Sequence, residues 1–338
     1  MRSPLRPGRA PVLAVVTAVL GLLAAACGGS DEGGSDQVAQ RPAPLTGLPV
    51  DGDVARRPAT TVKVDNSPQG RPQSGLDKAD LVIEEKVEGT ITRLLAVFHS
   101  NDAGSVGPVR SLRSTDVGLV APIGGVFAYA GGIAPFESLI RKAPVEVVTE
   151  KTDADTFDLR AGRERPFKTY TSSAKLRAKA GDKAKAPPRL FEFLGPGEAF
   201  APPGAAPAAG ATIVFGPRTT ATWDYDRASG EWRRSTNGTA HVVEGGGQLA
   251  FTNVIVQRTR YGTTIYRDRS GAPVDEAVVV GTGEAIVLTQ GKQVRARWAK
   301  ASQTAPTRYT LPDGTPVRLA PGRTWVELPP DNASVTIR

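Results

Sequence analysis

Charged side chains interrupt apolar stretches in the first half of this 338-residue chain. Glu84 and Glu88 share one face of either a strand or a helix, because a spacing of four residues suits both periods. Arg93 follows on the next predicted strand, after a short turn at Gly89-Thr90. A glutamate–arginine contact across this hairpin is therefore expected. It has two interpretations, an ion pair that holds the hairpin together or the charged wall of a binding cleft.

Arg110 and Arg113 form a second basic group, in the string Arg110-Ser111-Leu112-Arg113. Their spacing of three places both side chains together if a helix begins here, with Ser111 or Ser114 as its N-cap. Guanidinium groups bind carboxylate or phosphate through paired hydrogen bonds, and free N–H groups at a helix start attract anions. The string therefore predicts an anion-binding pocket. The alternative is that both arginines lie at the surface and pair with acidic neighbours.

Two more residues extend this pocket from the end of the first predicted strand. Asp65 lies at the carboxyl end of that strand, where ligands often bind in α/β sheets. Asp65 and Asn66 also fit a plain Asx turn. Arg71 follows shortly after and would add a further guanidinium. The predicted ligand-binding residues are Asp65, Arg71, Glu84, Glu88, Arg93, Arg110 and Arg113.

Catalysis by carboxylates is the alternative function. A glycosidase needs two carboxyl groups about 5–10 Å apart, and Asp65, Glu84 or Glu88 could supply them in an envelope glycan hydrolase or transferase. No G-x-S-x-G string occurs, and neither His99 nor His241 lies in a nucleophile motif, which excludes a serine triad. The sequence therefore assigns no catalytic residue, no metal ligand and no cofactor.

The elements that would position these residues alternate between strand and helix along residues 45–194. Sequence periodicity predicts strands at 59–65, 81–87, 91–98 and 125–130, and helices at 115–123, 135–143 and 172–184. This mixture indicates an α+β or α/β domain. Residues 211–338 contain short alternating runs separated by turn pairs such as Gln290-Gly291, and they predict a mostly-β domain.

Glycine and proline mark the breaks between these domains. The chain contains 37 glycines and 28 prolines, and its length predicts about two domains. Residues 28–44 are rich in glycine, serine and proline and predict a disordered tether. Residues 195–210 are rich in proline, alanine and glycine and predict a linker between an N-terminal domain, 45–194, and a C-terminal domain, 211–338.

The first 27 residues have the pattern of an export signal. A basic start is followed by an apolar run at 12–23, which is short for a membrane-spanning helix. Ala24-Ala25-Ala26 then precede Cys27, in an arrangement similar to a bacterial lipobox, in which the cysteine thiol receives a diacylglyceryl group. The alternative is an ordinary cleavable signal with an incidental cysteine. We predict lipidation at Cys27 and a place on the extracytoplasmic face of the cell membrane.

The composition excludes several classes of protein. One cysteine and two histidines rule out a disulfide scaffold, a cysteine-ligated zinc cluster and an iron–sulfur site. A 40% hydrophobic content with 22% charged residues rules out full disorder. The net charge of the chain is +8, and removal of the predicted signal with its three arginines would leave +5, a mild positive charge that fits nearby anionic lipids or wall polymers. No zinc finger or RNA-binding aromatic motif accompanies it, so we predict no nucleic-acid partner.

Several strings taken together resemble the YerB-like family of bacterial lipoproteins, whose halves are N- and C-terminal domains of unknown function. The resemblance rests on residues 44–49 (PLTGLP), 71–76 (RPQSGL), 87–93 (VEGTITR), 107–113 (GPVRSLR), 253–257 (NVIVQ), 281–283 (GTG) and 321–325 (PGRTW). It covers nearly all the chain after the tether. Membership implies a secreted, lipid-anchored, two-domain protein and supplies no activity.

The sequence therefore predicts a lipoprotein of the cell envelope. We favour a non-enzymatic protein that binds an anionic envelope ligand or a protein partner in its arginine and glutamate pocket. The envelope glycan hydrolase or transferase remains the alternative.

Overall fold

The computed structural model describes residues 40–267 and 271–338. The predicted signal, its Cys27 and most of the predicted tether lie outside the described residues. These residues belong to one unit of the chain, which ends at Arg338.

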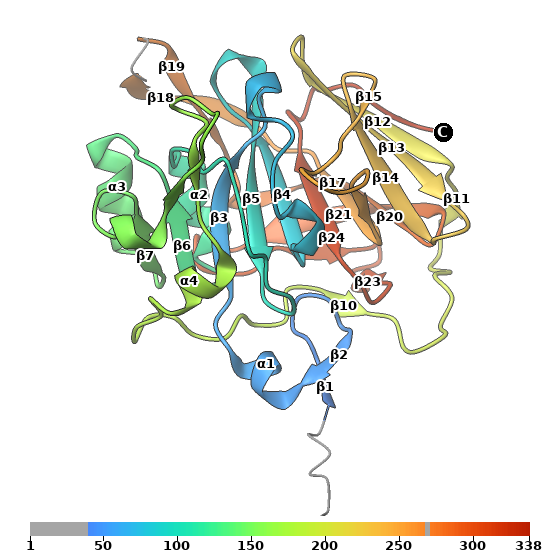
Figure 1. Cartoon of the computed structure of the whole chain (residues 1–338). Coiled ribbons are helices and arrows are strands. Elements are labelled where there is room, and N and C mark those ends of the chain that lie inside the picture. Colours follow the sequence, from blue (N-terminus) through green and yellow to red (C-terminus); the bar gives the residue numbers. More distant parts are fainter. Residues whose placement is uncertain (1–39, 268–270) are drawn as a thin grey trace, which may run out of the picture. The chain divides into compact units, whose positions relative to one another are not determined.

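An 11-stranded mixed sheet runs through this unit (Figure 1). Its strand order is β11 (Ala206–Pro207), β21 (Lys292–Lys300), β20 (Gly281–Thr289), β17 (Asn253–Gln257), β24 (Thr324–Leu328), β4 (Leu81–Lys86), β5 (Thr92–Phe98), β3 (Thr60–Asp65), β6 (Val126–Tyr129) and β7 (Glu146–Thr149), with β22 (Arg308–Thr310) on β21. Strand β24 pairs in parallel with β4. Because β24 comes from the second predicted domain and β4 from the first, both stretches contribute to one sheet.

A second, smaller sheet packs against part of the first. Its strand order is β15 (Thr239–Ala240), β14 (Glu231–Thr236), β13 (Thr219–Asp226), β12 (Gly210–Gly216) and β25 (Val335–Ile337), with β16 (Ala250–Phe251) on β14. The remaining strands form the pairs β1 (Gln40–Pro42) with β2 (Pro49–Asp51), β8 (Asp158–Leu159) with β9 (Thr169–Tyr170), β10 (Glu192–Phe193) with β23 (Arg318–Leu319), and β18 (Tyr261–Arg267) with β19 (Pro273–Ala277).

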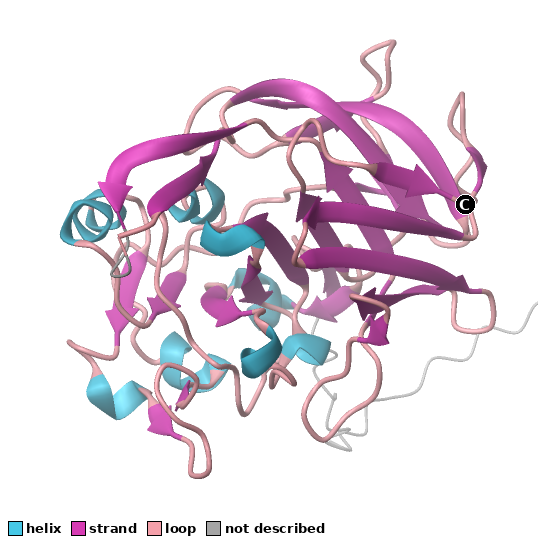
Figure 2. Ribbon diagram, turned by 90° about the horizontal axis from the view of Figure 1, so that it is seen from above, coloured by secondary structure: helices cyan, strands magenta, loops and turns pink. Residues whose placement is uncertain are grey.

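The helices are short. They are α1 (Gly52–Arg56), α2 (Ser114–Val120), α3 (Ala134–Arg141) and α4 (Ser173–Arg177), together with the 3₁₀ turns η1 (Pro68–Gly70), η2 (Leu76–Lys78), η3 (Glu88–Thr90) and η4 (Ala154–Thr156). Figure 2 shows the helices toward the left of the view and the second sheet toward the right. The helix expected at 172–184 ends at Arg177, ahead of Gly181.

Two apolar layers cover the two faces of the central sheet. On one face, Leu95 and Val97 pack with Phe136 of α3 and with the core side of α2. On the other face, Leu94 and Phe98 pack with the second sheet and with α4. The central strands are nearly continuous apolar runs because a strand that is buried on both faces has no polar side.

The strands predicted at 59–65, 81–87, 91–98 and 125–130 are confirmed as β3, β4, β5 and β6. The mostly-β character of residues 211–338 is also confirmed. Among residues 45–194, each α-helix is between five and eight residues long. The α+β description of that half stays a prediction.

The stretch predicted as a linker is packed against the protein. Phe200 is 1% exposed, and the backbone of Ala206 and Pro207 joins the edge of the central sheet as β11. This proline- and glycine-rich stretch is therefore an ordered connection between the two predicted domains.

Candidate functional site

An open cleft of about 880 Å³ lies beside the start of β5 and the end of β6. Three of its side chains are the predicted Arg93, Arg110 and Arg113, and we refer to it as the arginine cleft. Its lining consists of Arg93, Val109, Arg110, Ser111, Arg113, Ala130, Gly131, Gly132, Ile133, Phe136, Glu150, Lys151, Arg165, Pro166, Thr169 and Val274. Val274 lies in β19, so both halves of the chain contribute to the cleft.

The main chain that carries the arginines is fixed between two strands of the central sheet. The N–H of Arg110 donates to the carbonyl of Lys63 in β3 (2.8 Å), and the carbonyl of Arg110 accepts from the N–H of Ala130 (2.9 Å). The N–H of Leu112 donates to the carbonyl of Gly131 (3.0 Å). Residues 110–112 therefore form an extended segment next to β3, and the predicted helix begins only after them.

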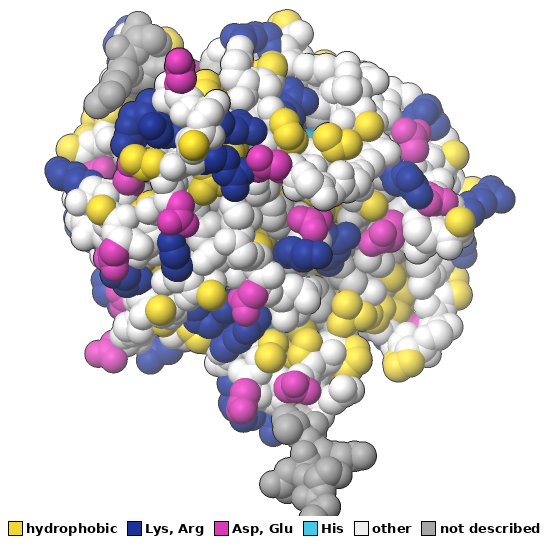
Figure 3. Space-filling view, viewed as in Figure 1, with side chains coloured by type: hydrophobic (Ala, Val, Ile, Leu, Met, Phe, Trp, Pro, Cys, Tyr) yellow, Lys and Arg dark blue, Asp and Glu magenta, His cyan; other side chains and the backbone are white. Residues whose placement is uncertain are grey.

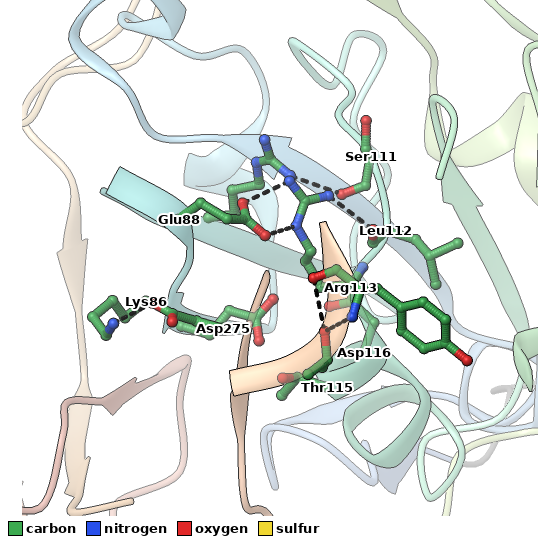
Figure 4. A network of polar contacts seen from close by, with 12 residues as sticks. Lys86, Glu88, Ser111, Leu112, Arg113, Thr115, Asp116 and Asp275 are labelled. Carbon is green, nitrogen blue, oxygen red and sulfur yellow. Dashed lines mark hydrogen bonds and ion pairs between the residues drawn. The ribbon is translucent and has the colours of Figure 1, made fainter. Parts of the chain in front are cut away.

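Arg113 lies immediately before α2 and binds Glu88 through two hydrogen bonds (Figure 4). Its Nε donates to Oε1 of Glu88 (2.6 Å), and its Nη2 donates to Oε2 (2.7 Å). The backbone N–H of Arg113 donates to Oδ2 of Asp116 (2.7 Å). The predicted N-caps Ser111 and Ser114 do not take this position, because the Asp116 carboxylate reaches back to the residue that precedes the helix.

Arg110 pairs with Asp65, which ends β3. The distance from Arg110 Nε to Asp65 Oδ2 is 2.7 Å. Nη1 of Arg110 also donates to the carbonyl of Pro166 (3.2 Å), and the guanidinium lies 5.3 Å from the centre of the Phe167 ring. Asp65 in addition accepts from the N–H of Ser67 (2.6 Å), which is the contact of an Asx turn. Asp65 therefore closes a turn and holds an arginine at once.

Arg93 differs from the other two arginines, because no described carboxylate forms an ion pair with it. Its side chain is 5% exposed. Nη1 donates to the carbonyl of Ser111 (3.2 Å), and Nε has no hydrogen-bond partner among the described residues. Burial, together with the charges of Arg113 and Arg110, lowers the pKa of Arg93 to about 10, although the charges of Glu88 and Asp65 act in the opposite direction. The cleft thus contains a buried cation that is incompletely satisfied.

The outer rim of the cleft carries further charges. Arg165 binds Glu150 through two contacts of 2.7 and 3.2 Å, and Thr169 donates to the same carboxylate (3.1 Å). Lys151 is exposed and forms no ion pair with any described residue. In Figure 3, Lys and Arg side chains gather at the upper left of the face shown. The rim therefore adds positive charge to that of the floor.

Glu84 does not reach the arginine cleft. In the pairing of β4 with β5, Glu85 lies opposite Arg93 and Glu84 lies opposite Leu94. Because side chains alternate along a strand, Glu84 and Arg93 point to opposite faces of the sheet. The contact expected between them is therefore not formed.

Glu84 belongs instead to a charged group buried between the two sheets, which we call the Arg234 network (Arg234, Glu84 and Glu327). Arg234 pairs with Glu84, and its Nη1 lies 3.3 Å from Oε1 of Glu327. Its guanidinium lies 4.7 Å from the centre of the Trp325 ring. Desolvation raises the pKa of Glu327 well above its usual value, and the charge of Glu84 adds to this.

The predicted Arg71 is not among the residues that line the arginine cleft. Burial lowers the pKa of Arg71, and the nearby positive charge of Arg234 contributes to this lowering.

A third charged group lies on the cleft side of the sheet and was missed from the sequence. Lys63 of β3 pairs with Glu85, and its Nζ donates to Oδ1 of Asp116 (2.6 Å). All three side chains are shielded from solvent. Desolvation raises the pKa of Glu85 to about 7, while Lys63 opposes this rise. The available signal was Lys63 itself, a charge inside an alternating apolar strand.

The described part of the chain does not bring together the side chains that metal binding needs. Residues 40–267 and 271–338 contain no cluster of three or more His, Cys, Asp or Glu side chains that could hold a metal ion. The longest described helix, α3, has eight residues, and none of the helices in these ranges could cross a bilayer.

Comparison with known proteins identifies the family of this chain. Residues 45–186 match the family described as "Protein of unknown function (DUF3048) N-terminal domain", and residues 211–326 match the corresponding C-terminal domain. The chain belongs to this family.

One relative is "Putative lipoprotein YerB" of Bacillus subtilis (strain 168), which is 27% identical over 306 residues and covers 87% of this chain and 88% of that protein. The crystal structure of YerB protein from Bacillus subtilis superposes with a TM-score of 0.74 at 26% identity and covers 87% of this chain and 99% of that one. The resemblance drawn from the sequence is confirmed.

Proposed function

We propose that this protein is a lipid-anchored protein of the extracytoplasmic membrane face, which binds an anionic envelope ligand in the arginine cleft without catalysing a reaction. The observation that carries the binding proposal concerns Arg93. This residue is 5% exposed, and within residues 40–267 and 271–338 its Nε has no hydrogen-bond partner and its guanidinium forms no ion pair. Burying a charge is costly unless the charge is paired. A bound anion would supply the missing partner.

The neighbours of Arg93 support an anion rather than a neutral ligand. Arg110 and Arg113 line the same cleft, and their charges disfavour the charged form of Arg93. Arginine binds phosphate and carboxylate through planar, paired hydrogen bonds, which a neutral ligand cannot match. An anion would therefore relieve the repulsion among the three guanidinium groups and gain charge-assisted hydrogen bonds.

The geometry does not favour the catalytic alternative. Glu84 faces away from the cleft and is held by Arg234, so it cannot act on one substrate together with Asp65 or Glu88. Asp65 and Glu88 are each held by an arginine. Each of these carboxylates is thus engaged by contacts within the protein, whereas a general acid or base must contact the substrate.

The anchoring proposal rests on Cys27, the only cysteine in the chain, and on the name of the B. subtilis relative, a putative lipoprotein. Two acyl chains hold a protein stably at a bilayer, whereas one holds it weakly. Cys27→Ser should move the protein from the membrane fraction to the soluble fraction of cells that express the full chain. Recovery of the variant in the membrane fraction would contradict the anchor.

Titration of the full chain with inorganic phosphate tests the binding proposal. We expect binding to the unchanged protein that weakens as salt increases. We expect Arg93→Gln to weaken it by about tenfold or more, equal to about 1.4 kcal/mol. Arg318→Gln is a matched control, because Arg318 pairs with Glu198 outside the cleft.

Thermal unfolding of the same variants separates binding from a structural role. If Arg93 only held the fold, Arg93→Gln would lower the melting temperature strongly. Because Arg93 has no carboxylate partner, we expect Arg93→Gln to leave that temperature nearly unchanged in the absence of phosphate. Absence of phosphate binding by the unchanged protein, or equal binding by Arg93→Gln, would refute the proposal.

A further inference from the structure

We propose that the ligand of the arginine cleft is a phosphate monoester that carries an apolar organic group. This rests on the proposed function, because it names the ligand class of the same site. The phosphoryl group would bind at the arginines, and the organic group would rest against the apolar wall formed by Ile133, Phe136 and Val274.

The charges of the cleft select a dianion. Three of its cations are matched by carboxylates, in the pairs Arg110–Asp65, Arg113–Glu88 and Arg165–Glu150. Arg93 and Lys151 are left without a carboxylate among the described residues, so two positive charges are uncompensated. A phosphate monoester carries between about 1.5 and 2 negative charges at neutral pH, because its second pKa is about 6. A carboxylate carries one.

The size of the cleft indicates more than an inorganic ion. Small-molecule sites commonly have volumes of about 300–1,000 Å³, and the arginine cleft has about 880 Å³. Besides its charged side chains, the cleft is lined by apolar side chains of β19 and of the region of α3. An organic group bonded to the phosphate would fill the part of the cleft beside these apolar side chains.

The wall on that side is apolar and firmly held. Phe136 is 2% exposed, and its ring meets the edge of the Tyr266 ring with 5.4 Å between centroids. Val274 is 1% exposed and lies in β19. Half-buried Ile133 lies at the start of α3 and completes this surface. Because protein already covers most of Phe136 and Val274, Ile133 offers most of the apolar surface on which an organic group could rest.

Calorimetric titration of the full chain with four probes tests the ligand class. The probes are phenyl phosphate, inorganic phosphate, benzoate and dihexanoyl phosphatidic acid. We expect phenyl phosphate to bind about tenfold or more tightly than inorganic phosphate and benzoate, because only phenyl phosphate has both a dianionic head and an apolar group. Binding of dihexanoyl phosphatidic acid as tight as that of phenyl phosphate would support a lipid source of the monoester. Weaker binding would support a soluble one.

One variant at exposed Lys151 and one at half-buried Ile133 separate the two contributions with little risk to folding. Lys151→Gln should weaken the binding of phenyl phosphate more than the binding of benzoate. Lys142→Gln changes an exposed lysine outside the cleft lining and should weaken the binding of neither probe. Ile133→Thr should bring the affinity for phenyl phosphate down toward that for inorganic phosphate.

The outcomes distinguish this inference from the proposed function. If benzoate binds as tightly as phenyl phosphate, the phosphate monoester is refuted while anion binding stands. If inorganic phosphate binds as tightly as phenyl phosphate, the apolar group is refuted. If none of the probes binds, both this inference and the proposed function fail.

Discussion

Replacing Arg234 with methionine should destabilise the protein strongly, because it leaves two carboxylates buried without their cation. Arg234, Glu84 and Glu327 are all 0% exposed, and Arg234 pairs with both acids. Removing one partner of a buried ion pair costs about 3–5 kcal/mol. Methionine keeps part of the packing against Trp325 but donates no hydrogen bond. We expect a loss near the upper end of that range, because two acids lose their partner.

The loss should shrink as the pH falls. The pKa of Glu327 is already well above its usual value through burial, and removal of the guanidinium would raise it further. The folded variant then binds more protons than the unfolded chain near neutral pH, so its free energy of unfolding decreases as the pH rises. The difference between Arg234→Met and the unchanged protein should therefore be smaller at about pH 5 than at about pH 8.

Urea unfolding followed by tryptophan fluorescence measures both effects, since Trp223 and Trp325 lie beside the network. Arg233→Met is a matched control. Arg233 is the next residue of β14, and its pair with Asp226 is at the surface. This control should change the free energy of unfolding very little. The reasoning would be refuted if Arg234→Met were no more destabilising than Arg233→Met, or if its deficit grew on acidification.

Two further predictions concern the space available for a Cβ atom at a glycine and the pH dependence of stability. Gly125→Ala should cost about 2 kcal/mol or more beyond Gly162→Ala in urea unfolding. Both glycines have a left-handed φ, but a Cβ at Gly125 would lie 2.1 Å from the carbonyl oxygen of Ala59, whereas nothing lies within 4 Å at Gly162. Equal losses would show that the close approach is relieved by a backbone shift. Glu85→Gln should flatten the pH dependence of stability. Glu85 has its folded pKa raised to about 7, so its folded form holds a proton that the unfolded chain has released, and stability falls as the pH rises from about 4.5 to 7. An unchanged slope in the variant would contradict the ionisation of Glu85 in this window.

The strands of the central sheet could be predicted because each is marked by a short run of apolar residues that is visible in the sequence itself. Apolar runs such as residues 81–83 and 94–98 fit strands that are buried on both faces. The hairpin turn at Gln290-Gly291 was also predictable. Both residues adopt positive φ, and the pair connects β20 to β21.

The pairing of these strands could not be predicted, because it depends on contacts between distant parts of the chain. Strand β24 lies next to β4 although more than two hundred residues separate them. The register between β4 and β5 determines which face of the sheet each carboxylate points to. In this register Glu85, and not Glu84, lies opposite Arg93. The sequence also divided the chain at 195–210, and the pairing of β24 with β4 joins the two parts into one sheet. We retain those domain boundaries as a proposal about sequence units.

The Arg234 network left a fainter signal in the sequence. Trp232, Arg234 and Thr236 alternate along β14, and all three are buried. A buried tryptophan therefore implied that the second of two adjacent arginines also faces inward. The sequence does not show which acids would meet Arg234, because Glu84 and Glu327 come from the other sheet.

The same register explains why the arginine cleft contains an unpaired cation. Glu85 lies directly opposite Arg93 on the same face of the sheet and would be its natural partner. Lys63, on the strand at the other side of β5, takes that carboxylate, and Asp116 completes the group. Asp116 also accepts a hydrogen bond from the backbone N–H of Arg113, and the side chain of Arg113 forms an ion pair with Glu88. Each of these acids is thus held by another cation, which leaves Arg93 without an ion pair among the described residues and is the reason why we propose an external anion as its partner.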